Sequence, residues 1–217
     1  MGTRNYITLS EDLSLSDRQK YRLGAMAAGV VACFDNNIGS WNPNEIPAKN
    51  GVRPTTGEVM AFLISTGGEP PASIDIREFE PILDAGAALD QWNTAALAAA
   101  GTEYSCFQAV AVPAIGLRAK KLVVWYRVQV ETVPLPVSRL IFRRNAANGI
   151  RTAAFDLEQL ATGEKVDGYL SSPQIWLPNM PHAINVMARN VVGAPTGLLA
   201  NVILGNFVFE PAGGVSA

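Results

Sequence analysis

Hydrophobic and polar residues alternate most clearly in the middle of the chain, in KLVVWYRVQVETV at positions 121–133. Such alternation over a long run is typical of a β-strand, because successive side chains point to opposite faces of the sheet. One predicted face carries Leu122, Val124, Tyr126, Val128 and Val130. The other face carries Val123, Trp125, Arg127, Gln129 and Glu131. The pattern therefore predicts a strand with one buried face.

The next alternating run is RLIFRRN at 139–145, and IRTAAFDLEQL follows it at 150–160. Both runs predict strands, and only a few residues separate them. Asn148 and Gly149 in this connection are typical of a two-residue type I′ turn, because both central positions of that turn need a positive φ. The segment therefore predicts a β-hairpin.

Six further hydrophobic runs predict strands, each bounded by Gly, Pro or Asn. They are EVMAFLIST (58–66), ASIDIREFEPIL (72–83), YSCFQAVAV (104–112), QIWL (174–177), AINVMARNVV (183–192) and LLANVILGNFVFE (198–210). Residues 84–101 are rich in Ala and predict a short helix between strands. Hydrophobic residues in 16–34 are spaced for one helical face, but the end of that stretch could equally begin a strand.

Short strands separated by turn signals predict an all-β fold. We expect a two-sheet β-sandwich of jelly-roll type with one or two short helices. A Greek-key immunoglobulin-like sandwich is the alternative, although the Cys–Trp–Cys spacing typical of that fold is absent. The predicted organisation is an N-terminal arm and loop region over residues 1–54 and a β-sandwich domain over residues 55–217.

Charged residues make up only 17% of the 217 residues, and hydrophobic residues make up 48%. A thinly charged surface favours a protein whose surface is partly covered by neighbouring subunits. The charges are also segregated along the chain. Residues 118–151 hold eight Lys or Arg and one acid, a net charge of +7, whereas residues 69–103 hold seven acids and one Arg, a net charge of −6. Two such segments could pair between subunits or meet a charged partner.

The chain has one histidine, His182, and two cysteines, Cys33 and Cys106. A structural zinc site needs about four Cys or His ligands, so no metal site is expected. No nucleophile elbow, phosphate-binding loop, HExxH motif or dinucleotide fingerprint occurs. We therefore expect no enzyme activity, no catalytic residues and no cofactor. Both cysteines lie in apolar runs, which favours buried free thiols and leaves a disulfide open.

Three arginines, Arg143, Arg144 and Arg151, lie close to the predicted hairpin tip. They are the candidate residues for subunit assembly or for contact with an anion. Nucleic acid is a possible partner, because several cations on one surface bind phosphates. It is not favoured, because the pI of the chain is about 5.5.

Three tryptophans lie beside Asn or Gln and are candidates for stacking on a sugar ring: Trp41, Trp92 and Trp176. They support an alternative in which the chain is a carbohydrate- or receptor-binding β-sandwich module, such as a spike or a lectin-like domain. Large aromatic residues are more often part of a core, so this interpretation competes with an ordinary packing role.

The first residues, MGTRNYITLSEDL, contain no apolar segment typical of a signal peptide. The longest apolar run, LGAMAAGVVACF at 23–34, is too short to span a bilayer. We therefore expect synthesis in a cytoplasm, no signal peptide and no membrane span.

The predicted jelly roll, the polar N-terminal arm, the long loops rich in Pro, Asn and Gly and the segregated charges together resemble single jelly-roll proteins of viruses. The resemblance is to coat, cement and decoration proteins, particularly those of bacteriophages, over residues 55–211. It covers fold and composition only, so it transfers no functional residue. It implies a virion structural protein, made in the host cytoplasm, whose partners are copies of itself and other capsid proteins.

Overall fold

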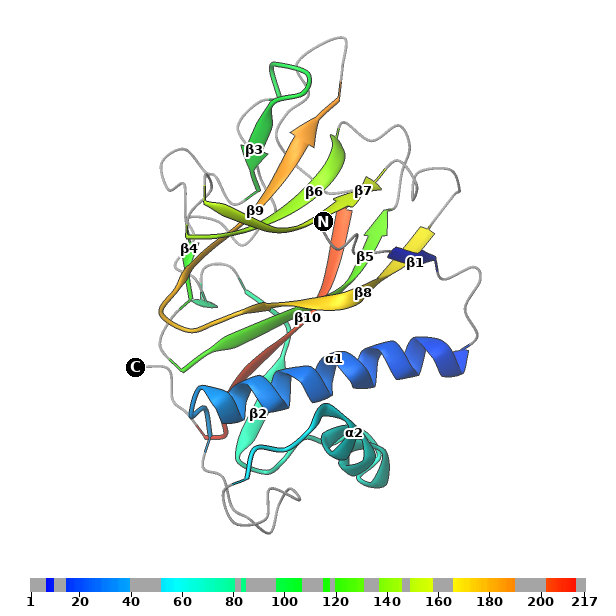
Figure 1. Ribbon diagram of the computed structural model, residues 1–217, viewed down its shortest axis with the longest axis vertical. Helices are drawn as coiled ribbons and strands as arrows, with labels where there is room; N and C mark the ends of the chain where they lie inside the picture. Colours follow the sequence, from blue (N-terminus) through cyan, green and yellow to red (C-terminus); the bar gives the residue numbers. More distant parts are fainter. Residues whose placement is uncertain are drawn as a thin grey trace.

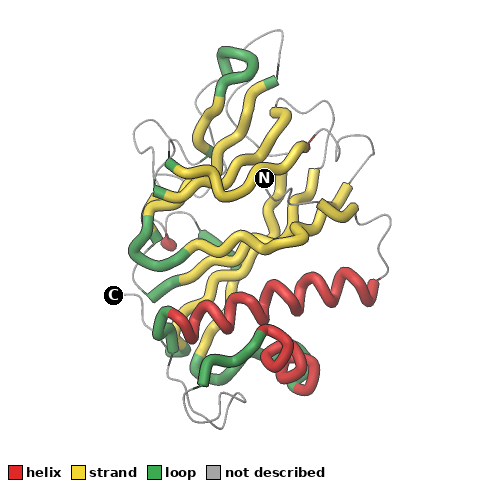
Figure 2. The backbone as a smooth tube through the Cα atoms, viewed as in Figure 1, coloured by secondary structure: helices red, strands yellow, loops and turns green. Residues whose placement is uncertain are grey.

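The computed structural model describes residues 7–9, 15–39, 52–80, 83–84, 97–106, 115–117, 120–130, 137–145, 149–157, 166–189 and 202–213. In this part of the chain two antiparallel β-sheets pack face to face, and two helices lie beneath the first sheet (Figure 1). Figure 2 shows the same layers in colour, with the strands in yellow and the helices in red.

The first sheet has five strands, in the spatial order β1 (Ile7–Leu9), β8 (Val166–Trp176), β5 (Leu122–Val130), β10 (Val202–Pro211) and β2 (Ile74–Arg77). The second sheet has the order β3 (Glu103–Ser105), β9 (Pro181–Ala188), β6 (Val137–Arg144) and β7 (Ile150–Asp156). The short strand β4 (Ile115–Gly116) also pairs with β9. Strand is therefore the predominant regular structure of the described chain, as the sequence predicts.

The strand pairs are nested within one another. β6 pairs with β7, β5 with β8, β3 with β9 and β2 with β10, so each pair encloses the previous one along the chain. The chain is thus one long antiparallel hairpin, and further pairing of β10 with β5 and of β9 with β6 rolls it into two sheets. Eight strands rolled in this way form a jelly roll. The predicted fold class is confirmed.

Helix α1 (Leu15–Asp35) settles the ambiguity left by the sequence, because the whole hydrophobic stretch is helical. It lies on the outer face of the first sheet, where Met26, Ala27, Val30 and Val31 are buried. Gly29 permits this close approach, because a Cβ there would lie 2.2 Å from Cζ of Phe209 in β10. Within residues 1–54, α1 is therefore packed against the sandwich.

Helix α2 (Thr56–Ser65) overturns the prediction that residues 58–66 form a strand. Its start is a capping box: the Thr55 hydroxyl accepts a hydrogen bond from the backbone N–H of Glu58, and the Glu58 carboxylate accepts one from the N–H of Thr55. Val59 and Leu63 are buried four residues apart, which matches one face of a helix. Together, the capping box and this spacing explain why the segment is helical.

Strand β5 also differs from its prediction, because both of its faces are buried. Leu122 and Val124 face the helices, whereas Val123 and Trp125 face the interior between the sheets. An irregularity in the pairing with β8 between Trp125 and Arg127 shifts the alternation. As a result Val128 joins Val123 and Trp125 in the interior, and not Leu122 and Val124 as predicted.

The predicted β6–β7 hairpin is confirmed, but its turn is not the predicted two-residue type. Arg144 pairs with Ile150, so five residues connect the strands. The positive φ, 66°, belongs to Asn145, whereas Gly149 has no positive φ. A glycine is required at 149 because a Cβ would lie 2.0 Å from the carbonyl oxygen of Arg144. Asn148 lies outside the described residues, as do 85–96 of the predicted helix.

A network of largely buried ion pairs holds β2 against the rest of the first sheet. The Asp84 carboxylate is fully buried and binds the Arg77 guanidinium and the Lys121 amine, with Nζ of Lys121 2.9 Å from Oδ1. Arg77 Nε also lies 2.9 Å from Oε1 of Glu210 in β10. Burial alone raises the pKa of Asp84, but hydrogen bonds from Arg77, the Glu80 backbone and Lys121 together hold it below its usual value.

Candidate functional site

The β6–β7 hairpin carries the three predicted arginines and gives them different surroundings. Arg143 is only 20% exposed and binds the Glu103 carboxylate in β3, with Nη2 2.6 Å from Oε2. Its Nη1 donates a hydrogen bond of 2.6 Å to the Gly149 carbonyl, which closes the hairpin. Arg143 is therefore occupied within its own subunit.

Arg143 and Arg151 lie directly opposite each other on paired strands. Like charges in such a pair repel, and Glu103 compensates this repulsion. The Glu103 carboxylate also accepts a hydrogen bond of 2.6 Å from Nδ2 of Asn185 in β9. Its pKa lies below the usual value because of the hydrogen bond from Arg143, which outweighs partial burial, with further help from Asn185 and the Arg151 charge.

Arg144 and Arg151 are exposed and make no ion pair with any described residue. Ile150 pairs with Arg144 and is 69% exposed, although large hydrophobic side chains are usually covered. Arg151 pairs with Arg143 and therefore lies on the other face of the hairpin end. We call Arg144, Ile150 and Arg151 the tip surface. An exposed apolar side chain beside an arginine is a feature of protein contact sites.

Beneath Arg144 is a small cavity of about 180 Å³ at the open side of the sandwich. Its walls come from both sheets: Arg144, Thr152, Pro173, Gln174, Ile175, Trp176 and His182. Because β8 supplies four of these residues, the cavity places the β6–β7 hairpin over β8.

His182 closes the cavity and is 2% exposed. Its ring stacks on Trp176 at 5.2 Å, and its Nε2 accepts a hydrogen bond of 2.9 Å from the Leu177 N–H. The pKa of His182 is lowered to about 4, mainly by burial and with a smaller contribution from the Arg144 charge, and the hydrogen bond with the Leu177 backbone offsets only part of this shift. His182 is therefore neutral at physiological pH and holds the turn between β8 and β9.

The tryptophan predictions have a mixed outcome. Trp176 is 2% exposed and packs against Trp125 and Phe79 in the interior, so its ring cannot stack on a sugar at the surface. The prediction for Trp176 is therefore wrong, because the end of β8 turns this side chain inward. Trp41 and Trp92 lie outside the described residues.

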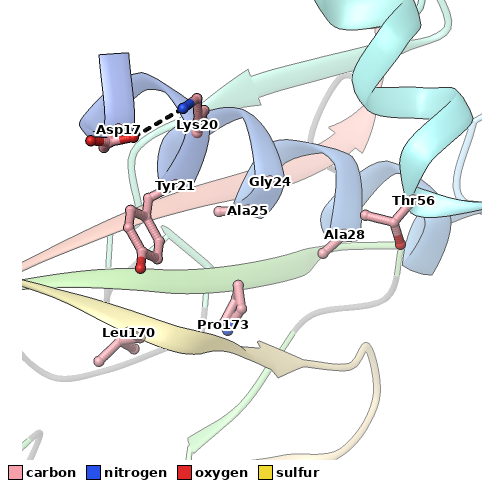
Figure 3. Close-up of a pocket in the computed structure, with 9 residues that line it drawn as sticks. All are labelled: Asp17, Lys20, Tyr21, Gly24, Ala25, Ala28, Thr56, Leu170 and Pro173. Atoms are coloured by element: carbon pink, nitrogen blue, oxygen red, sulfur yellow. Dashed lines mark hydrogen bonds and ion pairs between the residues drawn. The ribbon is translucent and has the colours of Figure 1, made fainter. Parts of the chain in front are cut away.

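A larger groove of about 520 Å³ lies between α1, the start of α2 and β8 (Figure 3). Its lining is mainly small or apolar: Tyr21, Gly24, Ala25, Ala28, Leu170 and Pro173, with Thr56 at one side. Asp17 and Lys20 also line it, but they neutralise each other in an exposed ion pair of 3.0 Å. The groove can hold an apolar group but offers no pair of groups arranged for acid–base catalysis.

Among the described residues, no group of three or more His, Cys, Asp or Glu could hold a metal ion. Cys33 and Cys106 are free and lie in different hydrophobic clusters, and burial raises the pKa of both thiols. Buried, protonated thiols are unreactive. No helix in the described ranges is long and apolar enough to cross a membrane.

A second charged surface follows the opposite edge of the first sheet. Four carboxylates there are exposed, one within β2 and the others close to its ends: Glu69, Asp75, Glu78 and Glu80. We call them the acidic edge. They make no ion pair with any residue that the structure describes, in contrast to Asp84 and Glu210 nearby.

Sequence reasoning missed Glu103, Asn185 and Ile150 as parts of the site. Ile150 could have been noticed, because it directly follows the turn and lies between arginines in sequence. Glu103 carries no local signal, because it reaches Arg143 only through the pairing of β3 with β9 and of β9 with β6.

The fold and site together define an all-β jelly-roll protein with a basic hairpin tip and an acidic sheet edge. Comparison of the chain with models of protein families, with curated proteins and with solved structures finds no match in any of the three.

Proposed function

We propose that the chain is a virion structural protein, a coat, cement or decoration subunit that assembles with copies of itself or binds a capsid lattice. The observation that carries the proposal is the nested pairing of eight strands into a single jelly roll, a fold used by viral capsid domains. The fold alone does not decide function, because lectin domains and enzymes share it.

The surface favours assembly over catalysis. The tip surface exposes an isoleucine opposite Arg144, with Arg151 on the other face of the hairpin, and the acidic edge exposes carboxylates that no described residue neutralises. Such features favour contact with another protein, because burying the exposed apolar area and pairing the charges would stabilise a complex. A hydrolytic triad would need His182 as its base, but the Nε2 of His182 accepts a hydrogen bond from the Leu177 N–H in the β8–β9 turn.

The arginines fit a protein partner better than a nucleic acid. Arg143 is neutralised by Glu103, so only Arg144 and Arg151 of the predicted cluster remain for a ligand. Two cations give a small share of the phosphate contacts that nucleic-acid binding requires. The proposed location is therefore the virion shell, after synthesis in the host cytoplasm, with capsid proteins as the main partners.

The experiment is to purify the chain and to measure its mass by light scattering at low and high salt, followed by electron microscopy of any large species. A symmetric oligomer, a shell or saturable binding to a capsid particle is the expected result. A monomer at every concentration and salt that also binds no capsid particle would refute the proposal.

A further inference from the structure

We propose that the tip surface of one copy docks on the acidic edge of a second copy, so that subunits join head to tail. This inference rests on the proposed function, because it assigns the surfaces through which the shell protein would assemble. It commits to one occupant, a second copy of this chain, and to one chemistry, the pairing of Arg144 and Arg151 with carboxylates.

The first argument is that each surface carries charges without an ion pair among the described residues, and that the charges of the two surfaces have opposite signs. Arg77, Lys121 and Arg143 each bind a carboxylate within the chain. Arg144 and Arg151 bind none among the described residues, and the four carboxylates of the acidic edge bind no described cation. The unpaired charges of the two surfaces are thus opposite in sign, which is the basis of electrostatic complementarity.

The second argument is the position of the two surfaces. β2 ends the first sheet on one side, and β8 lies toward its other side, with β5 and β10 between them. The cavity lined by Arg144, Thr152 and the end of β8 places the hairpin on the β8 side. β7 ends the second sheet on the β8 side, so the tip surface and the acidic edge lie at opposite edges of the sandwich, and one subunit cannot bring its own two surfaces together.

A contact between two different surfaces is heterologous, so each subunit keeps one surface free for the next neighbour. Such contacts repeat until they close into a ring or extend as a lattice. This is the geometry that a shell requires, whereas a contact of one surface with itself ends at a dimer.

The third argument is the apolar side chain at the tip. Ile150 is 69% exposed opposite Arg144, and its partner must offer apolar area as well as carboxylates. At the acidic edge, Ile76 is only partly buried and directly follows Asp75 in sequence. A phosphate backbone would satisfy the arginines but would leave the isoleucine exposed.

The test is an exchange of charge between the two surfaces in the full chain. One variant carries Arg144→Glu with Arg151→Glu, and the other carries Glu78→Lys with Glu80→Lys. Each variant alone places like charges at the contact, so its self-association should weaken by roughly tenfold to a hundredfold at low salt. An equal mixture of the two variants should associate again, because a contact between the two different variants joins opposite charges.

The matched control is Arg139→Glu, which reverses an exposed arginine of β6 outside the tip surface. It should leave association unchanged, and thermal unfolding should show that all variants fold. Wild-type assembly that neither variant weakens, or weakening that the mixture does not restore, would overturn the inference while leaving the proposed function standing. The inference would also be overturned if the wild type bound a single-stranded oligonucleotide, the reversed tip abolished that binding, and mixing the variants did not restore self-association. A wild-type chain that never assembles refutes the proposed function itself.

Discussion

The protonation of His182 should cost the protein a large share of its stability in mild acid. The pKa of His182 is about 4 in the folded protein, against an ordinary value of about 6.5 in an unfolded chain. As the pH falls below 6.5 the unfolded chain takes up the proton first, so the free energy of unfolding decreases until the pH reaches the folded pKa. Each unit of difference is worth about 1.4 kcal/mol, so the loss between pH 6.5 and 4 is about 3 kcal/mol.

The physical reason is that the protonated ring could no longer accept the hydrogen bond from the Leu177 N–H, and a second charge would lie near Arg144. Because the chain contains one histidine, its ring proton resonance can be followed by NMR without assignment. Urea unfolding at pH 7, 5 and 4 should then be compared with His182→Gln, which keeps an acceptor but does not titrate. A ring that titrates between pH 6 and 7, or equal pH dependence of both proteins, would refute the reasoning.

Three further predictions concern the packing and the charges. Gly29→Ala should destabilise the fold by about 1–3 kcal/mol in urea unfolding, because the new Cβ would overlap the buried Phe209 ring. The control Gly24→Ala has open space around its Cβ and should stabilise α1 by up to about 1 kcal/mol. Equal effects of the two substitutions would contradict this account. Asp84→Ala should cost about 3–5 kcal/mol, because buried Lys121 would keep only its longer contact of 3.5 Å with Glu210, and adding Lys121→Met should recover part of the loss. Glu103→Gln should cost about 1–2 kcal/mol at pH 7 and much less at an acidic pH below the lowered pKa of Glu103, where the wild-type carboxyl is also protonated and its contribution is lost. An equal cost at both pH values would show that the charge of Glu103 is irrelevant.

Most strands of the two sheets could be predicted from local signals, whereas β1, β4 and the first part of β8 could not. The runs that became β2, β6, β7, β9 and β10 are hydrophobic segments of strand length between turn residues. The same reasoning failed for α2, because EVMAFLIST is a short apolar run whose period does not distinguish helix from strand. The capping box of Thr55 and Glu58 was the signal that could have decided it.

The candidate site was predictable only as far as neighbours in sequence are neighbours in space. Arg144 and Arg151 lie together because a short turn joins their strands. The neutralisation of Arg143 depends on Glu103, which is 40 residues away along the chain and two strands away in the sheet. The inward position of Trp176 depends likewise on the register of β8 against β5, which no local pattern specifies.

The nested pairing of the strands has a consequence for how the protein is made. The innermost pair, β6 with β7, can form as soon as both strands leave the ribosome, because the loop that it closes is short. The outermost pair joins Ile74 to Pro211, and β10 also lies between β2 and β5 within the first sheet. Until β10 is synthesised, β2 has no partner among the described strands and one edge of β5 is unpaired. Folding should therefore be slow and can be completed only once β10 has been synthesised, with the hairpin that bears the tip surface formed well before β2 is paired.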